Sequence, residues 1–295
     1  KLPGGLIHVN VVGCALFAAI SGSSAATVAT VGKMSIPELR KRNYPEKILL
    51  GSLAGSGTLG LLIPPSIILI IYGVAVQESI AKLFIAGIIP GIMIALIFMS
   101  YVIIWSLINK KSMPKIIEEY SFFEKIKRSK QLLPVIILIL AVIGSIYTGI
   151  ATATEAASLG VVGALILSYF QKSLTLKTFK SSLLGATKTS CMIAFILAGS
   201  TFLSLAMGFT GLPRNLALWI QNMELSPYVL IFVLMIFYII LGMFLDGISA
   251  VVLTMAIIEP MIRQAGFDMI WFGIFLVIVV EMAQITPPVG FNLFV

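Results

Sequence analysis

GSGTLGLLIPP, residues 55–65, interrupts an apolar segment that is long enough to cross a lipid bilayer. The interruption belongs to a repeat with an offset of 223 residues, in which Pro37, Arg40, Pro64 and Pro65 correspond to Pro260, Arg263, Pro287 and Pro288. A broken helix exposes backbone polar groups that lipid cannot satisfy, so such breaks occur beside protein, water, an ion or a substrate. Two equivalent breaks in a repeated apolar chain indicate a secondary transporter.

The composition predicts an all-α integral membrane protein. Apolar residues make up 59% of the 295 residues, charged residues only 11%, and the mean hydropathy is +1.09. An ordinary soluble domain of this size carries more charge than this. The single histidine, His8, argues against a haem or zinc site, because such sites usually need several nitrogen or sulfur ligands.

Two kinds of apolar segment follow one another along the chain. Four are near the roughly 20 residues that a spanning helix needs; they are residues 84–108, 132–150, 153–170 and 190–209. Residues 6–39 and 228–264 are too long for one span, and each has a polar kink, ISGSS at 20–24 and LDGIS at 245–249. Arms of about 15 to 18 residues reach roughly 22 to 27 Å, short of a hydrocarbon core of about 30 Å. Both segments therefore predict re-entrant helical hairpins.

The basic residues predict the orientation. If the first hairpin enters from the cytoplasm and the broken helix 47–76 crosses outward, all of them except Lys82, Arg214 and Arg263 lie on the cytoplasmic side. Five crossings then separate the hairpins, so the second enters from the opposite face. The repeat is inverted, which lets one fold expose a midplane site to either side. The net charge of +8 is explained by the basic residues on the predicted cytoplasmic side, and it requires no nucleic-acid partner.

The repeat also predicts the domain organisation. Residues 1–80 form the first half of a transport domain, with the hairpin 6–39 and the broken helix 47–76. Residues 81–226 are mainly scaffold and arm helices. Residues 227–295 form the second half, with the hairpin 228–264 and the broken helix 267–295. Because the chain begins with Lys and stops inside an apolar run, we expect further residues at both ends.

The tips and breaks carry the candidate ion ligands. The glycines before Pro64-Pro65 let the helix unwind and release carbonyl groups, which together with hydroxyls suit Na⁺. In the first half the candidate Na⁺ ligands are Ser21, Gly57, Thr58, Gly60 and Pro64. In the second half they are Asp246, Gly247, Ser249, Thr286 and Pro287. Asp246 adds a carboxylate at membrane depth, which is a functional candidate by default. For either tip alone, close packing of a Gly/Ser cluster is the competing explanation.

The candidate substrate residues are Ser23, Ser24, Ser56 and Asn292. The tip hydroxyls lie where a returning helix would begin, and a helix N-terminus presents amides and a positive dipole end to an anion. Asn292, just past the second break, either faces this site or packs against other residues of the protein.

Three further segments allow a local prediction. Residues 152–155 have the spacing of a capping box, so Glu155 is expected to close the start of a helix. Glu281 is either a protonated core carboxyl or a neighbour of an ion site, and Glu259 is expected at the interface. Residues 112–131 have an apolar stripe at helical spacing beside lysines, which predicts a helix lying in the interface, and residues 174–184 repeat this pattern.

The motifs LPGG (2–5), AISGSSA (19–25), GSGTLGLLIPPS (55–66), TEAA (154–157) and ITPPVG (285–290) resemble the large membrane subunit of tripartite ATP-independent periplasmic (TRAP) transporters, over essentially the whole chain. The resemblance implies a Na⁺-driven, elevator-type importer of organic acids such as sialic acid or C4-dicarboxylates in the bacterial inner membrane. Its implied partners are a small four-helix membrane subunit and a periplasmic substrate-binding protein.

Other functions remain as alternatives. A channel needs a continuous polar lining, which the plain spans lack. An intramembrane enzyme needs a catalytic dyad or metal cluster, which His8 and the scattered acids do not supply. The runner-up is a single-component divalent-anion/sodium symporter with a similar plan of inverted hairpins.

Overall fold

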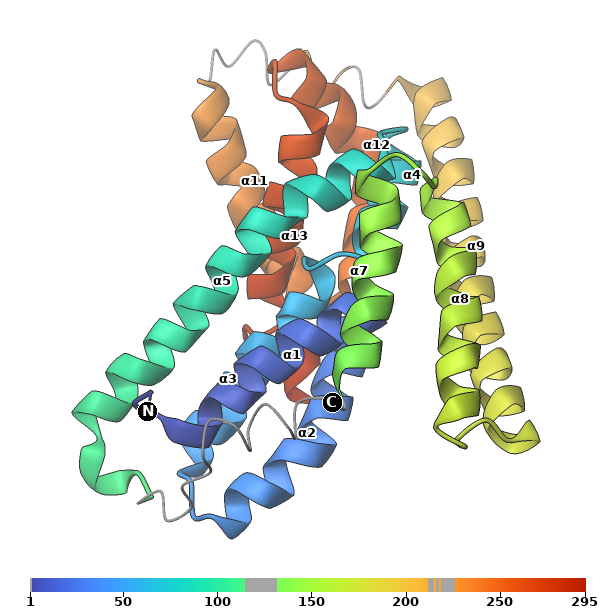
Figure 1. Ribbon diagram of the computed structural model, residues 1–295. Coiled ribbons are helices and arrows are strands. Elements are labelled where there is room, and N and C mark those ends of the chain that lie inside the picture. Colours follow the sequence, from blue (N-terminus) through green and yellow to red (C-terminus); the bar gives the residue numbers. More distant parts are fainter. Residues whose placement is uncertain (1, 115–131, 212–214, 216–217, 219–225) are drawn as a thin grey trace. The chain divides into compact units, whose positions relative to one another are not determined.

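The computed structural model describes residues 2–114, 132–211, 215, 218 and 226–295, and these residues are helical with no strand among them (Figure 1). Four of the helices are long and apolar enough to cross a membrane: Ile80–Ile108, Ala153–Phe170, Leu176–Thr210 and Gly247–Gln264. This confirms the all-α, membrane-type fold. The predicted interfacial helix at 112–131 lies almost wholly outside the described residues.

The first hairpin consists of α1 (His8–Ser21), preceded by the short η1 (Gly5–Ile7), and α2 (Ser24–Lys41). Gly22 ends α1 in a left-handed conformation with φ 60°, and its N–H donates to the carbonyl oxygen of Ala18. The Ser23 side chain then caps α2 by accepting from the N–H of Ala26. The two-residue tip therefore closes one helix and opens the next, as a helical hairpin requires.

The first break separates α3 (Glu46–Gly57) from α4 (Ile67–Ala75), with the 3₁₀ turn η2 (Thr58–Leu61) between them. The Ser66 hydroxyl donates to the carbonyl oxygen of Leu61 and accepts from the N–H of Leu69, so it satisfies backbone groups on both sides of the proline pair. This break lies within the segment 47–76 that the sequence predicts as a broken helix.

The second half repeats three of these boundaries. Its hairpin is α11 (Pro227–Gly242) and α12 (Gly247–Gln264), followed by α13 (Met269–Ala283) and, past the break, η5 (Phe291–Leu293). Both ends of α12 lie 223 residues after the ends of α2, and α13 begins 223 residues after α3. The peptide bond within each proline pair is cis. The repeat seen in the prolines and arginines is thus a repeat of helix boundaries.

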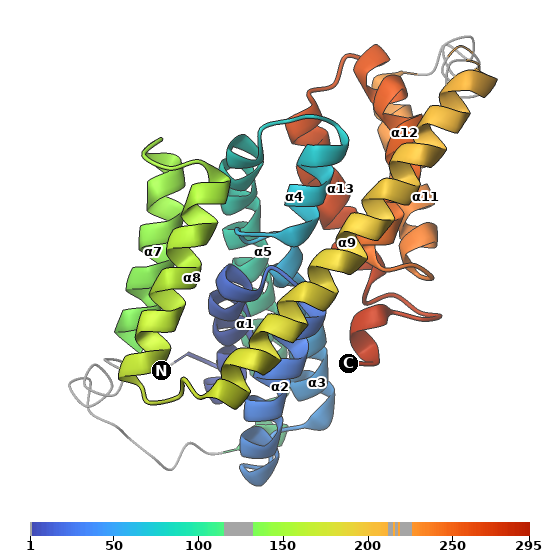
Figure 2. The ribbon, with the colours of Figure 1, turned by 90° about the vertical axis from the view of Figure 1, so that its right-hand side faces the viewer.

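The middle of the chain contains α5 (Ile80–Ile108), η3 (Lys110–Ser112), α7 (Leu133–Tyr147), α8 (Ala153–Phe170) and α9 (Leu176–Thr210). α8 has the predicted bounds, and the capping box of Thr152 and Glu155 at its start is present. The segment expected at 174–184 does not form a separate helix, because from Leu176 on it runs without interruption into the predicted span as one 35-residue helix (Figure 2). Its place in the interface stays a prediction. Thr175 and Thr178 bond each other at the start of this helix and set its first turn there rather than near residue 190.

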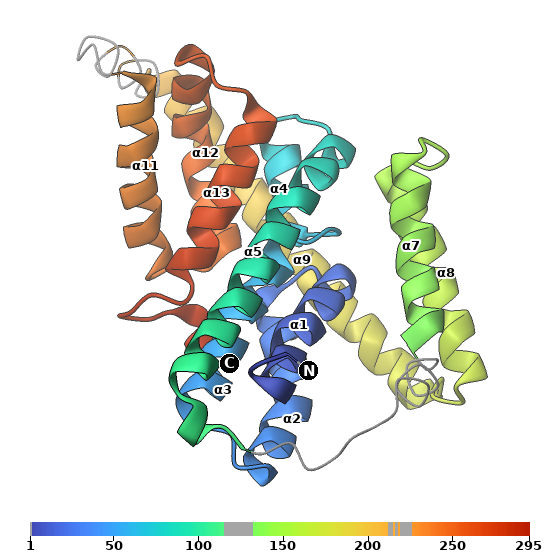
Figure 3. The ribbon, with the colours of Figure 1, turned by 60° about the vertical axis from the view of Figure 1, so that its left-hand side comes forward.

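The chain divides into two compact units, residues 1–115 with 200–295, and residues 116–199. In the second unit α7 packs along α8. In the first unit α1, α2 and α3 pack on one another, α11 packs on α13, and α5 runs past members of both halves (Figure 3). A buried cluster joins residues of the first half to α5: Ile7, Val11, Leu39, Tyr44, Ile48, Leu49 and, from α5, Val102. The first unit therefore brings both hairpins and both breaks together.

Candidate ion and substrate site

The first tip gathers three neutral oxygens. The hydroxyls of Ser21 and Thr27 lie 2.8 Å apart, and both bond the carbonyl oxygen of Ser23, at 3.3 and 2.7 Å. Thr27 is fully buried. Hydroxyl and carbonyl oxygens are suitable ligands for a monovalent cation at a helix break. Ser21 was predicted here; Thr27 was missed, although it lies one helical turn after Ser23 and periodicity could have found it.

The first break lies against this tip at two glycines. A Cβ atom placed on Gly60 would lie 2.5 Å from the carbonyl oxygen of Ser23, and one on Gly57 would lie 2.0 Å from the Val28 side chain. Only a residue without a side chain allows such an approach of two backbones. The structure thus brings Gly60 to the tip oxygens, whereas Gly57 packs on Val28 of α2.

The tip also contacts the proline pair. The N–H of Ile67 donates to the carbonyl oxygen of Gly22 at 3.2 Å, and a Cβ on Gly22 would lie 2.7 Å from the carbonyl oxygen of Pro65. Pro64 is buried beside this contact. Tip and break of the first half therefore form one packed element.

Two predicted residues of the first break use their hydroxyls locally. Thr58 donates to the carbonyl oxygen of Gly55 at 2.8 Å, and Ser56 donates to that of Ser52 at 2.5 Å. Both side chains are buried. Each hydroxyl oxygen keeps acceptor capacity, so these bonds orient the lone pairs rather than remove them.

The second tip is built around Asp246. Its carboxylate caps α12 by accepting from the N–H groups of Ile248 and Ser249, at 3.1 and 3.2 Å, and from the Ser249 hydroxyl at 2.5 Å. Gly247 is buried, and a Cβ there would lie 2.8 Å from Val280 of α13. The structure therefore brings together Asp246, Gly247 and Ser249.

The second break is less enclosed than the first. Pro287 is exposed, and the Thr286 hydroxyl donates to the carbonyl oxygen of Met282 in the preceding turn, at 2.6 Å. No hydrogen bond among the described residues joins Thr286 to Asp246. Two buried side chains near this break have polar atoms without a hydrogen-bond partner within the described ranges. These atoms are Oδ1 and Nδ2 of Asn292 and Oε1 of Glu281. Asn292 therefore has a buried acceptor and a buried donor that no described residue satisfies.

A contact that sequence reasoning missed joins the two halves. The Ser24 hydroxyl donates to Oε1 of Gln284 at 2.8 Å, and both residues are buried. They are 260 positions apart, and no local pattern pairs them. The first tip therefore meets the second break, and Ser24, predicted to face a substrate, is bonded to protein.

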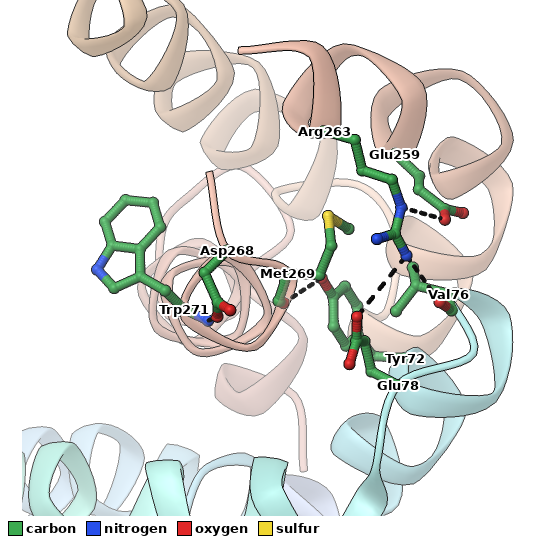
Figure 4. Close-up of polar contacts among 8 residues, drawn as sticks. All are labelled: Tyr72, Val76, Glu78, Glu259, Arg263, Asp268, Met269 and Trp271. Carbon is green, nitrogen blue, oxygen red and sulfur yellow. Dashed lines mark hydrogen bonds and ion pairs between the residues drawn. The ribbon is translucent and has the colours of Figure 1, made fainter. Parts of the chain in front are cut away.

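The two halves also meet where α4 ends and α13 begins (Figure 4). The Tyr72 hydroxyl of α4 donates to the carbonyl oxygen of Met269 at 2.6 Å. Arg263 donates to Glu259 at 2.9 Å and to the carbonyl oxygen of Val76 at 3.1 Å, and lies 3.8 Å from Glu78. The equivalent Arg40 instead bonds Glu46 within its own half, at 2.7 Å. That hydrogen bond and the arginine charge lower the pKa of the Glu46 carboxyl.

Comparison with known proteins shows the family to which the chain belongs. The family described as "Tripartite ATP-independent periplasmic transporter, DctM component" matches residues 1–295. A "C4-dicarboxylate TRAP transporter large permease protein DctM" of Pseudomonas aeruginosa is 35% identical over 99% of this chain and 68% of that protein. An "Isethionate TRAP transporter permease protein DctMQ" of Oleidesulfovibrio alaskensis is 33% identical, over 100% of this chain and 46% of that protein. A "Sialic acid TRAP transporter permease protein SiaT" of Haemophilus influenzae is 33% identical, over 99% and 47%.

Proposed function

Since the chain belongs to the DctM family of tripartite ATP-independent periplasmic transporters, we propose that its paired tips and breaks bind Na⁺ and an organic acid and carry both across the membrane. The observation that carries the proposal is the packing of each tip on a helix break, with Ser21, Ser23 and Thr27 presenting oxygens beside Gly60 in the first half. Such discontinuous helices are the usual ion and substrate sites of secondary transporters.

Sodium binds in this proposal at two places. In the first half the ligands come from Ser21, Thr58 and the carbonyl groups at Gly57, Gly60 and Pro64, joined by Thr27. In the second half they come from Asp246, Gly247, Ser249, Thr286 and Pro287. The first set is neutral and the second contains one carboxylate, so the two ions meet different electrostatic surroundings.

The substrate is an organic acid held without a dedicated basic side chain. The N-terminus of α2, at Ser23–Ser24, supplies amide groups and a positive dipole end. Bound Na⁺ supplies further positive charge, and Asn292 supplies an amide. Relatives named for C4-dicarboxylates, isethionate and sialic acid support the class of small organic anions. Sialic acid and C4-dicarboxylates are the first substrates to test.

Transport proceeds by an elevator motion in which both hairpins, re-entrant from opposite faces, move with the broken helices. Residues 1–80 and 227–295 form the moving domain, and residues 81–226 supply mainly scaffold. The gathering of residues 1–115 and 200–295 in one compact unit supports the pairing of the two halves.

The partners are a small four-helix membrane subunit and a periplasmic binding protein that delivers the acid, in the bacterial inner membrane. A relative whose name joins the M and Q components supports the first partner. The competing function is a single-component divalent-anion/sodium symporter, which needs no binding protein.

Reconstituted uptake tests the proposal. The full-length permease with its small subunit is placed in proteoliposomes, and labelled succinate or N-acetylneuraminate is added with and without the binding protein and a Na⁺ gradient. We expect uptake only when both are present. Uptake driven by a proton gradient alone would refute Na⁺ coupling, and uptake without the binding protein would favour the symporter.

A pair of variants ties the first ion site to this assay. Thr27→Val keeps the shape of a buried side chain but removes one oxygen, and should raise the Na⁺ concentration for half-maximal uptake roughly tenfold, as expected when a charged ligand loses one polar partner. Ser100→Ala removes a hydroxyl whose one hydrogen bond among the described residues goes to the carbonyl oxygen of Leu96 in α5, and serves as the control. Equal effects of the two changes would exclude Thr27 from the site.

Cysteine labelling tests the inversion. A cysteine at Arg42 follows the first hairpin, and one at Gly266 follows the second at the equivalent end of α12. We expect the first to react only from the cytoplasm and the second only from the periplasm. Labelling of position 266 from the cytoplasm would refute the inverted arrangement of the hairpins.

A further inference from the structure

Gln284 contacts the first residue of each returning hairpin helix. Its Oε1 accepts the Ser24 hydroxyl at 2.8 Å, and Ser24 is the first residue of α2. A Cβ placed on Gly247, the first residue of α12, would lie 3.1 Å from Nε2 of Gln284. The side chain is only 2% exposed. One buried amide therefore touches both tips.

The backbone of Gln284 is fixed to the second break on both sides. Its N–H donates to the carbonyl oxygen of Val280 at 3.0 Å, which completes the last turn of α13. Its carbonyl oxygen accepts the N–H of Asn292 at 3.1 Å, from the segment beyond the prolines. A rearrangement of the second break on ion binding therefore moves the amide that holds the first tip.

The chemistry of the side chain suits this position. The N-terminus of α2 carries a positive dipole end that its neutral Ser23 cap leaves uncompensated, whereas the Asp246 carboxylate caps that of α12. The neutral amide of Gln284 accepts a hydrogen bond from Ser24, packs against Gly247, and adds no charge beside the N-terminus of α2. A carboxylate in the same place would interact with the helix N-terminus instead of the substrate anion.

We propose that Gln284 is a positioning residue that couples the two hairpin tips, so that Na⁺ binding in one half favours Na⁺ binding in the other. The proposal rests on the Na⁺ coupling proposed above and extends it to cooperativity. When a shared element must adopt one arrangement for both ligands, the two bindings assist each other by the same factor. Severing the Ser24–Gln284 bond should leave two ion sites that fill independently.

A second contact between the halves provides a matched control. The Tyr72 hydroxyl donates to the carbonyl oxygen of Met269, and Tyr72 is fully buried like the Ser24–Gln284 pair. It lies at the other ends of α4 and α13 from the breaks. Tyr72→Phe removes a cross-half hydrogen bond with no connection to a tip, so it reports what the loss of such a bond does to stability alone.

The test is the Na⁺ dependence of thermal unfolding of the purified full-length permease, which needs no substrate. The wild-type protein should show a stabilisation that rises with a Hill coefficient above unity. Gln284→Met, which preserves side-chain length, and Ser24→Ala should reduce the coefficient to unity. Tyr72→Phe should lower the unfolding temperature without Na⁺ and keep the wild-type coefficient.

The outcomes separate the two proposals. A wild-type protein that Na⁺ does not stabilise overturns the proposed Na⁺ coupling, and this inference with it. A wild-type protein stabilised with a coefficient of unity, or variants at Ser24 and Gln284 that keep the wild-type coefficient, overturn the inference and leave Na⁺ coupling intact. If Gln284→Met does not fold, Ser24→Ala decides by itself.

Discussion

The two halves share helix boundaries but place their small residues differently. In the first half Gly60 lets the Ser23 carbonyl of the tip approach the break. The equivalent residue of the second half is Ala283, which is buried, and its methyl group packs instead on Gly242 of α11. In the first half the glycine lies in the broken helix, and in the second half it lies in the hairpin. The repeat therefore preserves the course of the backbone, while each half has different small residues where two segments pack closely.

The tips differ in charge as well. Ser23 caps α2 with a neutral hydroxyl, whereas Asp246 caps α12 with a carboxylate. Both residues lie at equivalent positions, and both accept hydrogen bonds from backbone N–H groups of the helix that follows. Only the second therefore adds a negative charge next to a helix N-terminus, and this difference is the basis for expecting two unlike ion sites.

The largest expected effect is at Gly60. Gly60→Ala places a methyl group against the Ser23 carbonyl, which belongs to the backbone and cannot rotate away. We expect a loss of about 1–3 kcal/mol of stability, the range for overpacking, and loss of uptake. Gly51→Ala in the preceding helix α3 is the control, because nothing lies within 4 Å of its added Cβ. Thermal unfolding of both variants should separate them, and equal midpoints would show that tip and break do not pack as described.

The second effect is at Asp246. Asp246→Ala removes the acceptor of two N–H groups and a hydroxyl, and should cost about 0.5–2 kcal/mol, as for a lost N-cap. Asp246→Asn keeps an acceptor but no charge, so it should retain the unfolding midpoint while weakening Na⁺ stabilisation. Ser23→Asn, which adds no charge to the first tip, is the comparison. Unchanged Na⁺ dependence in Asp246→Asn would mean that the carboxylate serves only as a cap.

A smaller difference separates the two arginines of the repeat. Arg263 joins α12 to the end of α4, whereas Arg40 pairs with Glu46 inside one half. Exposed ion pairs contribute about 0–1 kcal/mol, and Arg263 adds a hydrogen bond to a carbonyl group. Arg263→Ala should therefore lower the unfolding midpoint more than Arg40→Ala does. The reverse order would show that the contacts in Figure 4 do not hold the halves together.

The smallest effect is the pH dependence of the Arg40–Glu46 pair. Glu46 lies before the predicted crossing 47–76, and its pKa is lowered in the folded protein. The pair therefore stabilises above the unfolded pKa of about 4.3, and this contribution is lost as the pH falls through the lower folded value. Unfolding midpoints of the wild-type protein and Glu46→Gln should differ slightly at neutral pH and converge in acid. A gap that widens in acid would reverse the assigned sign.

Local signals were sufficient for the helix boundaries. Glycine, proline and capping residues act on their own few neighbours, so the breaks at Pro64-Pro65 and the start of α8 at Ala153 followed from the sequence. The start of α9 did not, because its first turns carry lysines and a span was sought in the apolar part alone. Helix continuity needs only hydrogen bonds, and a polar stretch can provide them as well as an apolar one.

The site was predictable only in part, for a different physical reason. Ser21 and Gly60 belong to adjacent segments, and a hairpin followed by a broken helix brings them together. The Ser24–Gln284 bond depends on how the two halves dock, and Gln284 is an ordinary polar residue in its own segment. Contacts of this kind follow from tertiary packing and have no signature in either stretch of sequence.

Gly22 has a consequence for how the gene can vary. Any other residue there would hold its side chain against the carbonyl oxygen of Pro65, in a backbone conformation with φ 60° that costs most residues about 1–2 kcal/mol. At the equivalent position the second half has Leu245, which is partly exposed and carries a side chain without such conflict. In a library of single substitutions read out by growth on the transported acid, position 22 should therefore tolerate no missense codon, while position 245 should accept several apolar ones.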